Sequence, residues 1–213
     1  MTGRGLFVVL EGPEGSGKST LAGPLAGRMR AHGVEPLVVR EPGGTRVGEI
    51  ARQALLDPEH PVGALAELFL YLAARAELVS TVIAPALDAG RVVLSDRFSL
   101  STEAYQMAGR RLPVEVVLPA NRAAAAGRRP DLTLILDLPP EVGRTRQMAA
   151  GKRLDRLDAE SDEFHRRVID YYLAVQGEGV RHLDGCLPPD RLLQAAWEEI
   201  AGLDPQRFGT ERG

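Results

Sequence analysis

The sequence has 213 residues and a mass of 23.0 kDa, which suits one domain spanning residues 1–213. Its hydrophobic fraction of 44% and charged fraction of 26% are those of a globular protein and exclude wholesale disorder. The net charge of −3 argues against nucleic-acid binding led by phosphate neutralisation, and the single cysteine, Cys186, excludes an internal disulfide and a cysteine-rich zinc site.

The apolar stretches of the sequence are short. The longest, such as residues 68–74, fall far short of the roughly 20 residues that a membrane-spanning helix needs. Residues 6–10 are too short for the core of a signal peptide, and Glu11 interrupts them. We therefore expect a soluble, cytoplasmic protein that binds neither membranes nor nucleic acid.

Short apolar runs, which predict strands, alternate along the chain with longer segments of helical periodicity. The predicted strands are residues 6–10, 36–39, 92–95, 132–138 and 180–183. The predicted helices are residues 18–31, 46–56, 64–89, 102–107, 141–150, 160–176 and 190–201. Residues 120–129 are rich in alanine and predict a helix end and a loop, and residues 206–213 predict a frayed tail.

The pattern of these elements predicts the fold class. The strands are almost wholly apolar rather than alternating, as expected when helices cover both faces of a sheet. Strands that alternate with helices favour parallel pairing. We therefore expect an α/β fold with a doubly wound, five-stranded parallel sheet flanked by helices.

A glycine-rich motif lies between the first predicted strand and the first predicted helix. It matches the P-loop pattern G-x-x-x-x-G-K-[ST] and comprises Gly12, Pro13, Glu14, Gly15, Ser16, Gly17, Lys18, Ser19 and Thr20. The glycines let successive backbone N–H groups face a phosphate, and the helix adds the positive end of its dipole. In such a loop Lys18 reaches the β- and γ-phosphates, and the Ser19 hydroxyl ligates Mg²⁺. The motif predicts a P-loop NTPase fold that binds a purine nucleoside triphosphate with Mg²⁺.

A P-loop alone does not distinguish a switch GTPase, a motor ATPase and a small-molecule kinase. The chain has neither an Asn-Lys-x-Asp motif for reading guanine nor an Asp-x-x-Gly switch. The GTPase interpretation is therefore disfavoured.

Four further segments, in this order and spacing, resemble the bacterial thymidylate kinase family. They are Arg40-Glu41-Pro42-Gly43-Gly44-Thr45, Leu72-Ala73-Ala74-Arg75, Asp96-Arg97-Phe98 leading into Ser101-Thr102-Glu103-Ala104-Tyr105-Gln106, and Leu154-Asp155-Arg156-Leu157-Asp158. The likeness covers nearly the whole chain, from about residue 6 to residue 201. It implies phosphoryl transfer from ATP to dTMP, giving dTDP and ADP, for dTTP synthesis.

The chemistry of such an acceptor agrees with the residues available. A nucleoside monophosphate is largely dianionic near neutral pH, because its second phosphate pKa is roughly 6. Its oxygen can therefore attack without a general base, and the enzyme supplies in-line positioning and positive charge. The four histidines are scattered along the chain, and we interpret them as surface or structural residues.

The resemblance assigns roles to residues around the phosphates. It implies that Lys18 and Arg97 are catalytic and that Arg97 grips the acceptor phosphate. Arg75 is implied near the base and the phosphate of the acceptor. Glu14 is expected at the 3′-hydroxyl or the metal. Asp96 is expected near the water shell of Mg²⁺, the expected cofactor, together with Ser19.

The resemblance also assigns a pocket for the acceptor nucleoside. Tyr71 stands where the family usually stacks a phenylalanine on thymine, and Tyr retains the stacking face. Ser101, Thr102 and Gln106 belong to the substrate-binding set, the last two as readers of the base edge, and Tyr105 lies near the sugar. Glu41 and Pro42 match a cis peptide beside this pocket.

The arginine-rich segment over about residues 144–158 is implied to be a short lid over ATP. The P-loop contains no arginine, so the lid supplies one catalytic positive charge. Arg153 and Arg156 are the candidates, with Arg146 behind them, and Arg144 is interpreted as solvated. The family also implies a homodimer, to which the apolar run at residues 65–72 could contribute helix–helix contacts.

Two alternatives stay open. One is another P-loop kinase, such as a deoxynucleoside kinase or a kinase for a different monophosphate. A nucleoside acceptor would need a carboxylate base to take its hydroxyl proton, and Glu41 is the candidate. The other is a regulatory nucleotide-binding protein without catalysis, which the presence of Lys18, Ser19 and Arg97 disfavours.

Overall fold

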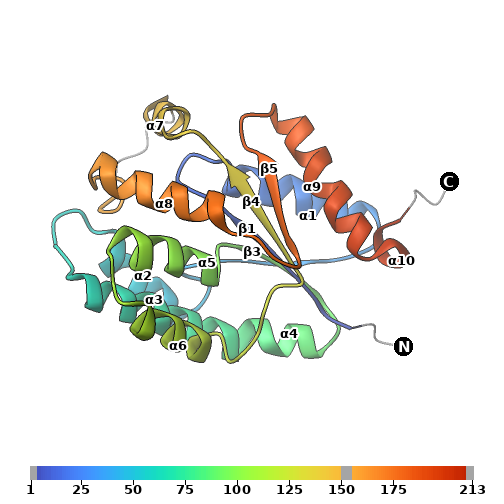
Figure 1. Ribbon diagram of the computed structural model, residues 1–213. Coiled ribbons are helices and arrows are strands. Elements are labelled where there is room, and N and C mark those ends of the chain that lie inside the picture. The colour runs from blue at the N-terminus through green and yellow to red at the C-terminus, as the bar shows by residue number, and fades with distance from the viewer. Residues whose placement is uncertain (1–3, 150–154, 210–213) are drawn as a thin grey trace.

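The computed structural model describes residues 4–149 and 155–209. Within them, five strands form one parallel sheet in the order β2-β3-β1-β4-β5 (Figure 1). The strands are β1 (Leu6–Glu11), β2 (Leu37–Arg40), β3 (Val92–Asp96), β4 (Leu132–Asp137) and β5 (Val180–Asp184). The five-stranded parallel sheet of an α/β fold is thus confirmed, and each strand overlaps its predicted run.

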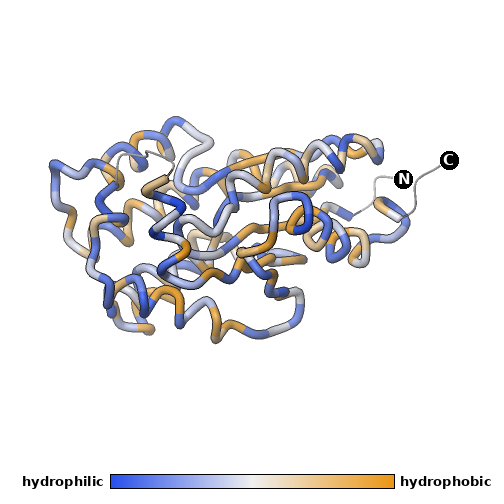
Figure 2. Tube along the Cα trace, turned by 90° about the horizontal axis from the view of Figure 1, so that it is seen from above, coloured by the Kyte–Doolittle hydropathy of each residue, from blue (hydrophilic) through white to orange (hydrophobic). Residues whose placement is uncertain are grey.

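Helices cover both faces of this sheet. They are α1 (Lys18–Ala31), α2 (Arg46–Leu56), α3 (Ala64–Leu78), η1 (Val79–Ile83), α4 (Ala84–Asp88), α5 (Ser99–Thr102), η2 (Glu103–Gly109), α6 (Val114–Ala124), α7 (Pro140–Ala149), α8 (Asp162–Ala174), α9 (Pro189–Leu203) and α10 (Pro205–Phe208). The segments labelled η are π-helical. Figure 2 shows that hydrophobic residues follow the inner strands.

Burial of alternate residues on the central strand explains the two layers. Val8 and Leu10 of β1 pack with α1 and α9 in one core cluster. Phe7 and Val9 pack with α3, η1 and α4 in the other. All residues of β1 are buried, so its continuous apolar pattern reflects cover on both faces.

The predicted helix at 64–89 is confirmed as one continuous helical stretch, Ala64–Asp88, whose middle part is π-helical, so that it comprises α3, η1 and α4. The helix end and loop predicted at 120–129 are also confirmed, since α6 ends at Ala124. The start of α6 at Val114 was not predicted, because its tertiary contacts override a β-branched start and an internal Pro119. One expectation about the elements is wrong. The expected frayed tail at 206–213 contains the last turn of α10, whose Phe208 is buried and lies 5.6 Å from the Trp197 ring.

The stretch Ala64–Asp88 is long and apolar enough to cross a membrane by length and composition alone, which the sequence analysis did not expect. It lies along the sheet and buries two charged residues, Glu67 and Arg75, that form ion pairs with other segments of the chain. Ion pairs of this kind are those of a helix packed inside a protein.

Candidate active site

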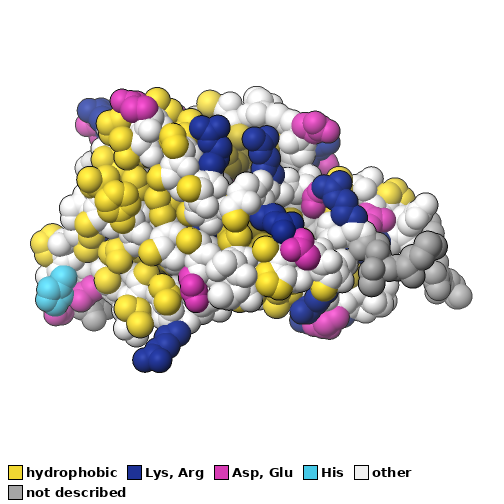
Figure 3. Space-filling model, turned by 90° about the horizontal axis from the view of Figure 1, so that it is seen from below, with side chains coloured by type: hydrophobic (Ala, Val, Ile, Leu, Met, Phe, Trp, Pro, Cys, Tyr) yellow, Lys and Arg dark blue, Asp and Glu magenta, His cyan; other side chains and the backbone are white. Residues whose placement is uncertain are grey.

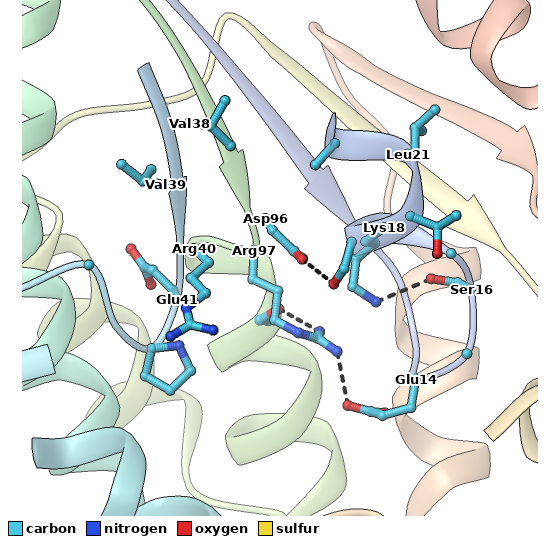
Figure 4. Close-up of a pocket in the computed structure, with 18 of the residues that line it drawn as sticks. Glu14, Ser16, Lys18, Leu21, Val38, Val39, Arg40, Glu41, Asp96 and Arg97 are labelled. Atoms are coloured by element: carbon cyan, nitrogen blue, oxygen red, sulfur yellow. Dashed lines mark hydrogen bonds and ion pairs between the residues drawn. The ribbon is translucent and has the colours of Figure 1, made fainter. Parts of the chain in front are cut away.

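A cavity of about 1110 Å³ lies at the carboxyl ends of β1, β2 and β3. Ligands of open parallel α/β sheets bind at this edge, where loops from neighbouring strands diverge. The P-loop forms one wall, Glu41 lies on the opposite side, and the Arg97 side chain projects between them (Figure 4). Pro42 also lines the cavity. The Glu41–Pro42 bond is cis, as the resemblance implies.

The P-loop folds around the Lys18 ammonium. Lys18 Nζ donates to Gly12 O at 2.8 Å, to Pro13 O at 2.7 Å and to Ser16 Oγ at 3.1 Å. Burial, and then the Arg97 guanidinium, lower the pKa of Lys18 to about 7, while the Glu14 and Asp96 carboxylates oppose the shift. The loop thus holds a buried cation in the space that a polyphosphate would enter.

The P-loop contacts α7 through two glycines. A Cβ on Gly15 would lie 2.5 Å from Gly143 O, and a Cβ on Gly143 would lie 2.8 Å from Glu14 O. Arg146, one turn further along α7, lines the cavity and donates to Gly185 O at 2.8 Å. The two backbones therefore touch, and α7 places an arginine beside the P-loop.

Two oxygen-bearing side chains meet next to the P-loop. Ser19 Oγ donates to Asp96 Oδ2 at 2.6 Å, and both residues line the cavity. Residues 4–149 and 155–209 contain no group of three His, Cys, Asp or Glu side chains that could hold a metal ion. A hydroxyl and a carboxylate fit Mg²⁺, which prefers oxygen ligands and is held in kinases by one or two protein groups with substrate phosphates.

Arg97 lies at the centre of the cavity and pairs with Glu14. Its Nη2 donates to Glu14 Oε1 at 2.9 Å and its Nη1 to Ser101 Oγ at 3.0 Å. Glu14 also accepts from the Tyr105 hydroxyl. Burial alone would raise the pKa of Glu14, but the Arg97 and Lys18 charges lower it overall, so the carboxylate stays ionised. The guanidinium lies 5.1 Å from the Tyr105 ring centroid.

Arg75 is placed differently from its expected role. The side chain is 1% exposed and is not among the residues that line the cavity. Its five N–H groups donate to four acceptors: Glu41 Oε2, Thr102 Oγ1, Asn121 Oδ1 and the carbonyl of Phe98. Arg75 thus holds the cavity residues Glu41 and Thr102 from behind, and direct contact with a substrate stays a prediction.

The remaining residues of the expected acceptor pocket line the cavity. They are Glu41, Pro42, Tyr71, Ser101, Thr102, Tyr105 and Gln106. Tyr71 is half-buried on α3, while Tyr105 and Gln106 lie on the π-helical segment η2. Short π-helical segments are frequent at functional sites.

Glu11 is a buried acidic residue that the sequence analysis did not assign to the site. Its Oε1 accepts from the Phe98 and Ser101 N–H groups and its Oε2 from the Ser101 and Tyr172 hydroxyls. Burial raises the pKa of Glu11, although the Arg97 charge and these hydrogen bonds oppose the shift. The signal was present in the sequence, since Glu11 ends an otherwise apolar strand.

Glu67 is a second buried acid that sequence reasoning missed. It lies on α3 with no exposed surface and accepts from Gln106, Arg110 and Arg156. Arg156, a candidate lid residue, donates to Glu67 Oε2 at 2.5 Å and to Leu55 O at 3.1 Å and is not among the residues lining the cavity. The other candidate, Arg153, lies outside the described residues.

Comparisons with known proteins agree with this geometry. A family model described as thymidylate kinase matches residues 10–192. The chain is 50% identical over 213 residues to a protein named thymidylate kinase from Pseudomonas fluorescens, which covers 98% of this chain and 99% of the relative. It is 44% identical over 197 residues to a protein of the same name from Thermomicrobium roseum, covering 91% and 93%.

Proposed function

The chain belongs to the thymidylate kinase family and phosphorylates dTMP at the expense of ATP, giving dTDP, and we propose that the two nucleotides meet in the cavity between Lys18 and Arg97. The observation that carries this assignment is the pairing of a complete P-loop with an arginine held at the opposite side of the same cavity. Lys18 is buried and the Arg97 side chain is only 18% exposed, so their charges act on a phosphoryl group with less screening than in water.

We assign the ATP side of the reaction to the P-loop, residues 12–20. Its backbone N–H groups bind the phosphates, and Lys18 stabilises the negative charge that develops on the transferring phosphoryl group. Ser19 and Asp96 are the residues that would hold Mg²⁺, which supplies charge neutralisation of the phosphates when bound.

The acceptor side is assigned to Arg97 and the residues around it. Arg97 holds the dTMP phosphate in line with the γ-phosphoryl group, and its pairing with Glu14 fixes the direction of its fork. Tyr71 stacks on the thymine ring, and Thr102 and Gln106 meet the edge of the base. Tyr105 closes the pocket beside the sugar, where a tyrosine leaves little room for a ribose 2′-hydroxyl.

The lid assignment stays with the segment at about residues 144–158. Among its described arginines, Arg146 lines the cavity, Arg156 is bound to Glu67, and Arg144 pairs at the surface with Asp162. Arg146 is therefore the described residue of this segment best placed to add positive charge near the P-loop. Closure of the segment would exclude water, which competes with dTMP as acceptor.

The homodimer is a proposal that an exposed apolar surface supports. Figure 3 shows hydrophobic side chains gathered on one face of the molecule. The exposed members form what we call the apolar surface: Val47 and Ile50 on α2, Leu65 and Phe69 on α3, and Val114 and Val116 on α6. A large exposed apolar patch on a globular protein marks an interface. We also propose a cytoplasmic location without nucleic-acid or membrane partners, in keeping with the net charge of −3.

A coupled assay tests the function. The protein is given ATP with dTMP, dUMP, the ribose form of TMP, dCMP or thymidine, and ADP release is measured. We expect dTMP to be the preferred acceptor and Lys18→Ala to lower kcat by a factor on the order of 10²–10³, as for loss of one charge-stabilising contact. Turnover of thymidine without turnover of dTMP would instead favour a nucleoside kinase with Glu41 as base.

A further inference from the structure

Glu67 occupies the junction between the base pocket and the segment that follows residues 150–154. Its carboxylate has no exposed surface. Oε1 accepts from Gln106 Nε2 at 2.8 Å and from Arg110 Nε at 3.1 Å, and Oε2 accepts from Arg110 Nη2 at 3.0 Å and from Arg156 Nη2 at 2.5 Å. One buried acid therefore joins two arginines to a glutamine that lines the cavity.

Two arginines form ion pairs with the buried Glu67 carboxylate. Arg110 forks across both carboxylate oxygens, and Arg156 adds a third charged donor. Because both oxygens of Glu67 accept from guanidinium groups, the side chain offers Gln106 an acceptor and no donor.

This property fixes the orientation of the Gln106 side-chain amide. Only the NH₂ group of Gln106 can face Glu67, because its carbonyl would otherwise oppose a carboxylate. In the described residues, Gln106 Oε1 accepts no hydrogen bond. The buried side-chain atom without a partner in these residues is Glu41 Oε1, so the unpaired Gln106 Oε1 is an accessible atom. The Gln106 carbonyl is therefore the atom that this residue turns to the cavity, as an acceptor.

We infer that Glu67 is a specificity-determining positioning residue: by orienting the Gln106 amide, it makes the base pocket accept a pyrimidine that carries a hydrogen on N3. This inference rests on the proposed function of the cavity. Thymine has an N3–H that donates to the Gln106 carbonyl. The N3 of a cytosine base carries a lone pair, which opposes that carbonyl and leaves both acceptors unpaired. A buried site built for one hydrogen bond strongly rejects an analogue that lacks it.

In the variant Glu67→Gln we expect the orientation of the Gln106 amide to be reversed. Arg110 and Arg156 can donate only, so they claim the single carbonyl oxygen of the introduced amide. The NH₂ group of that amide then faces Gln106, whose own amide turns its carbonyl toward position 67 and its NH₂ to the cavity. The rewired pocket presents a donor where the native pocket presents an acceptor.

The test compares dTMP with 5-methyl-dCMP, which keeps the ring methyl group but has no N3–H. For the wild-type enzyme we expect kcat/KM to favour dTMP strongly. For Glu67→Gln we expect the ratio of the two kcat/KM values to fall at least tenfold, mainly through a higher KM for dTMP. Glu160→Gln is the matched control, because Glu160 also pairs with Arg110, at 2.5 Å, without contacting Gln106. We expect it to keep the wild-type ratio.

Two further variants keep the inference falsifiable. Gln106→Met removes the amide. If Glu67 acts through Gln106, the double variant Gln106→Met/Glu67→Gln should have the same ratio of kcat/KM values as Gln106→Met alone. Glu67→Asp keeps an acceptor-only carboxylate, so its ratio should lie closer to wild type than that of Glu67→Gln. A folded Glu67→Gln protein with a ratio within twofold of wild type would overturn the inference, and so would such a ratio in Gln106→Met, because Glu67 is inferred to act through Gln106. A wild-type protein that does not phosphorylate dTMP would instead overturn the proposed function.

Discussion

At the scale of single residues, the contribution of Tyr71 to dTMP binding can be measured separately from its contribution to stability. The ring lines the cavity and also packs against the core cluster that contains Tyr105 and Phe164. We expect Tyr71→Phe to be nearly silent and Tyr71→Ala to raise the dTMP KM about tenfold or more, since base–aromatic stacking contributes about 1–3 kcal/mol. Steady-state kinetics and melting temperatures measure the two effects.

The control for Tyr71 is Tyr171→Ala. Tyr171 packs against the same core cluster but is not among the residues that line the cavity. It should lower the melting temperature and leave the dTMP KM unchanged. If Tyr71→Ala only lowered the melting temperature, Tyr71 would be a core residue and not a stacking platform.

We expect ATP binding to depend on pH because the pKa of Lys18 is lowered. Its pKa of about 7 leaves it largely neutral in the free protein at pH 8, and bound phosphates raise that pKa again by favouring the charged form. ATP binding at pH 8 should therefore take up a proton, and affinity should fall as pH rises from 7. Calorimetry in two buffers of different ionisation enthalpy measures the uptake.

The matched variant is Lys18→Arg. Arginine stays charged at pH 8, so proton uptake should vanish in this variant wherever ATP still binds. Equal heats in both buffers for the wild-type protein would contradict the prediction.

Site residues could be predicted from the sequence where the residues that define them are close together along the chain. Lys18 and Ser19 are defined by neighbours within one loop, so their place in the cavity could be predicted. The partners of Arg75, by contrast, are Glu41, Thr102 and Asn121, which three separate segments deliver. No spacing in the sequence reveals that these groups converge, and the burial of Arg75 could not be predicted.

At the scale of elements, the π-helical segment η2 is held in place by a glycine. A Cβ on Gly109 would lie 2.6 Å from the Phe164 ring of α8. We expect Gly109→Ala to push η2 away from α8, displace Tyr105 and Gln106, and raise the dTMP KM severalfold with loss of stability. Kinetics with dTMP and thermal denaturation measure both consequences.

Gly27→Ala in α1 provides the contrasting case. No atom lies within 4 Å of a Cβ at this position, and α1 is a regular helix there. Alanine should stabilise the protein by about 0.5–1 kcal/mol, because it restricts the unfolded chain and favours helix. If Gly109→Ala and Gly27→Ala destabilised the protein equally, the close approach of Gly109 to Phe164 would not contribute to stability.

Elements were predictable where a local signal in the sequence marks their start. Helices α1 and α2 match their predicted ranges, because a capping position or the P-loop marks the start of each. The start of α6 was not predicted, since Val114, Val116 and Val117 favour strands in isolation. The change from α-helix to π-helix in η1 and η2 leaves no periodic signal that a short window detects.

At the scale of the whole molecule, the apolar surface predicts assembly. Phe69, the aromatic residue of this surface, lies on α3 and is 55% exposed. We expect Phe69→Glu to convert a dimer into a monomer, because a charge buried in an apolar interface lacks a partner. Light scattering during size-exclusion chromatography measures the mass. Leu203→Glu, an exposed leucine on α9 outside this surface, should remain dimeric. A wild-type mass of one chain at micromolar concentration would contradict the dimer.

The touching backbones of Gly15 and Gly143 have a consequence for how the molecule tolerates change. Gly143 lies 128 positions along the chain from Gly15, yet any side chain there would meet Glu14 O and the side chain of Leu138. Saturation mutagenesis should therefore show position 143 to be as intolerant as the P-loop itself, with growth or activity lost even for alanine. By this measure the phosphate-binding loop extends into α7: part of its shape is encoded in a residue that no P-loop pattern includes.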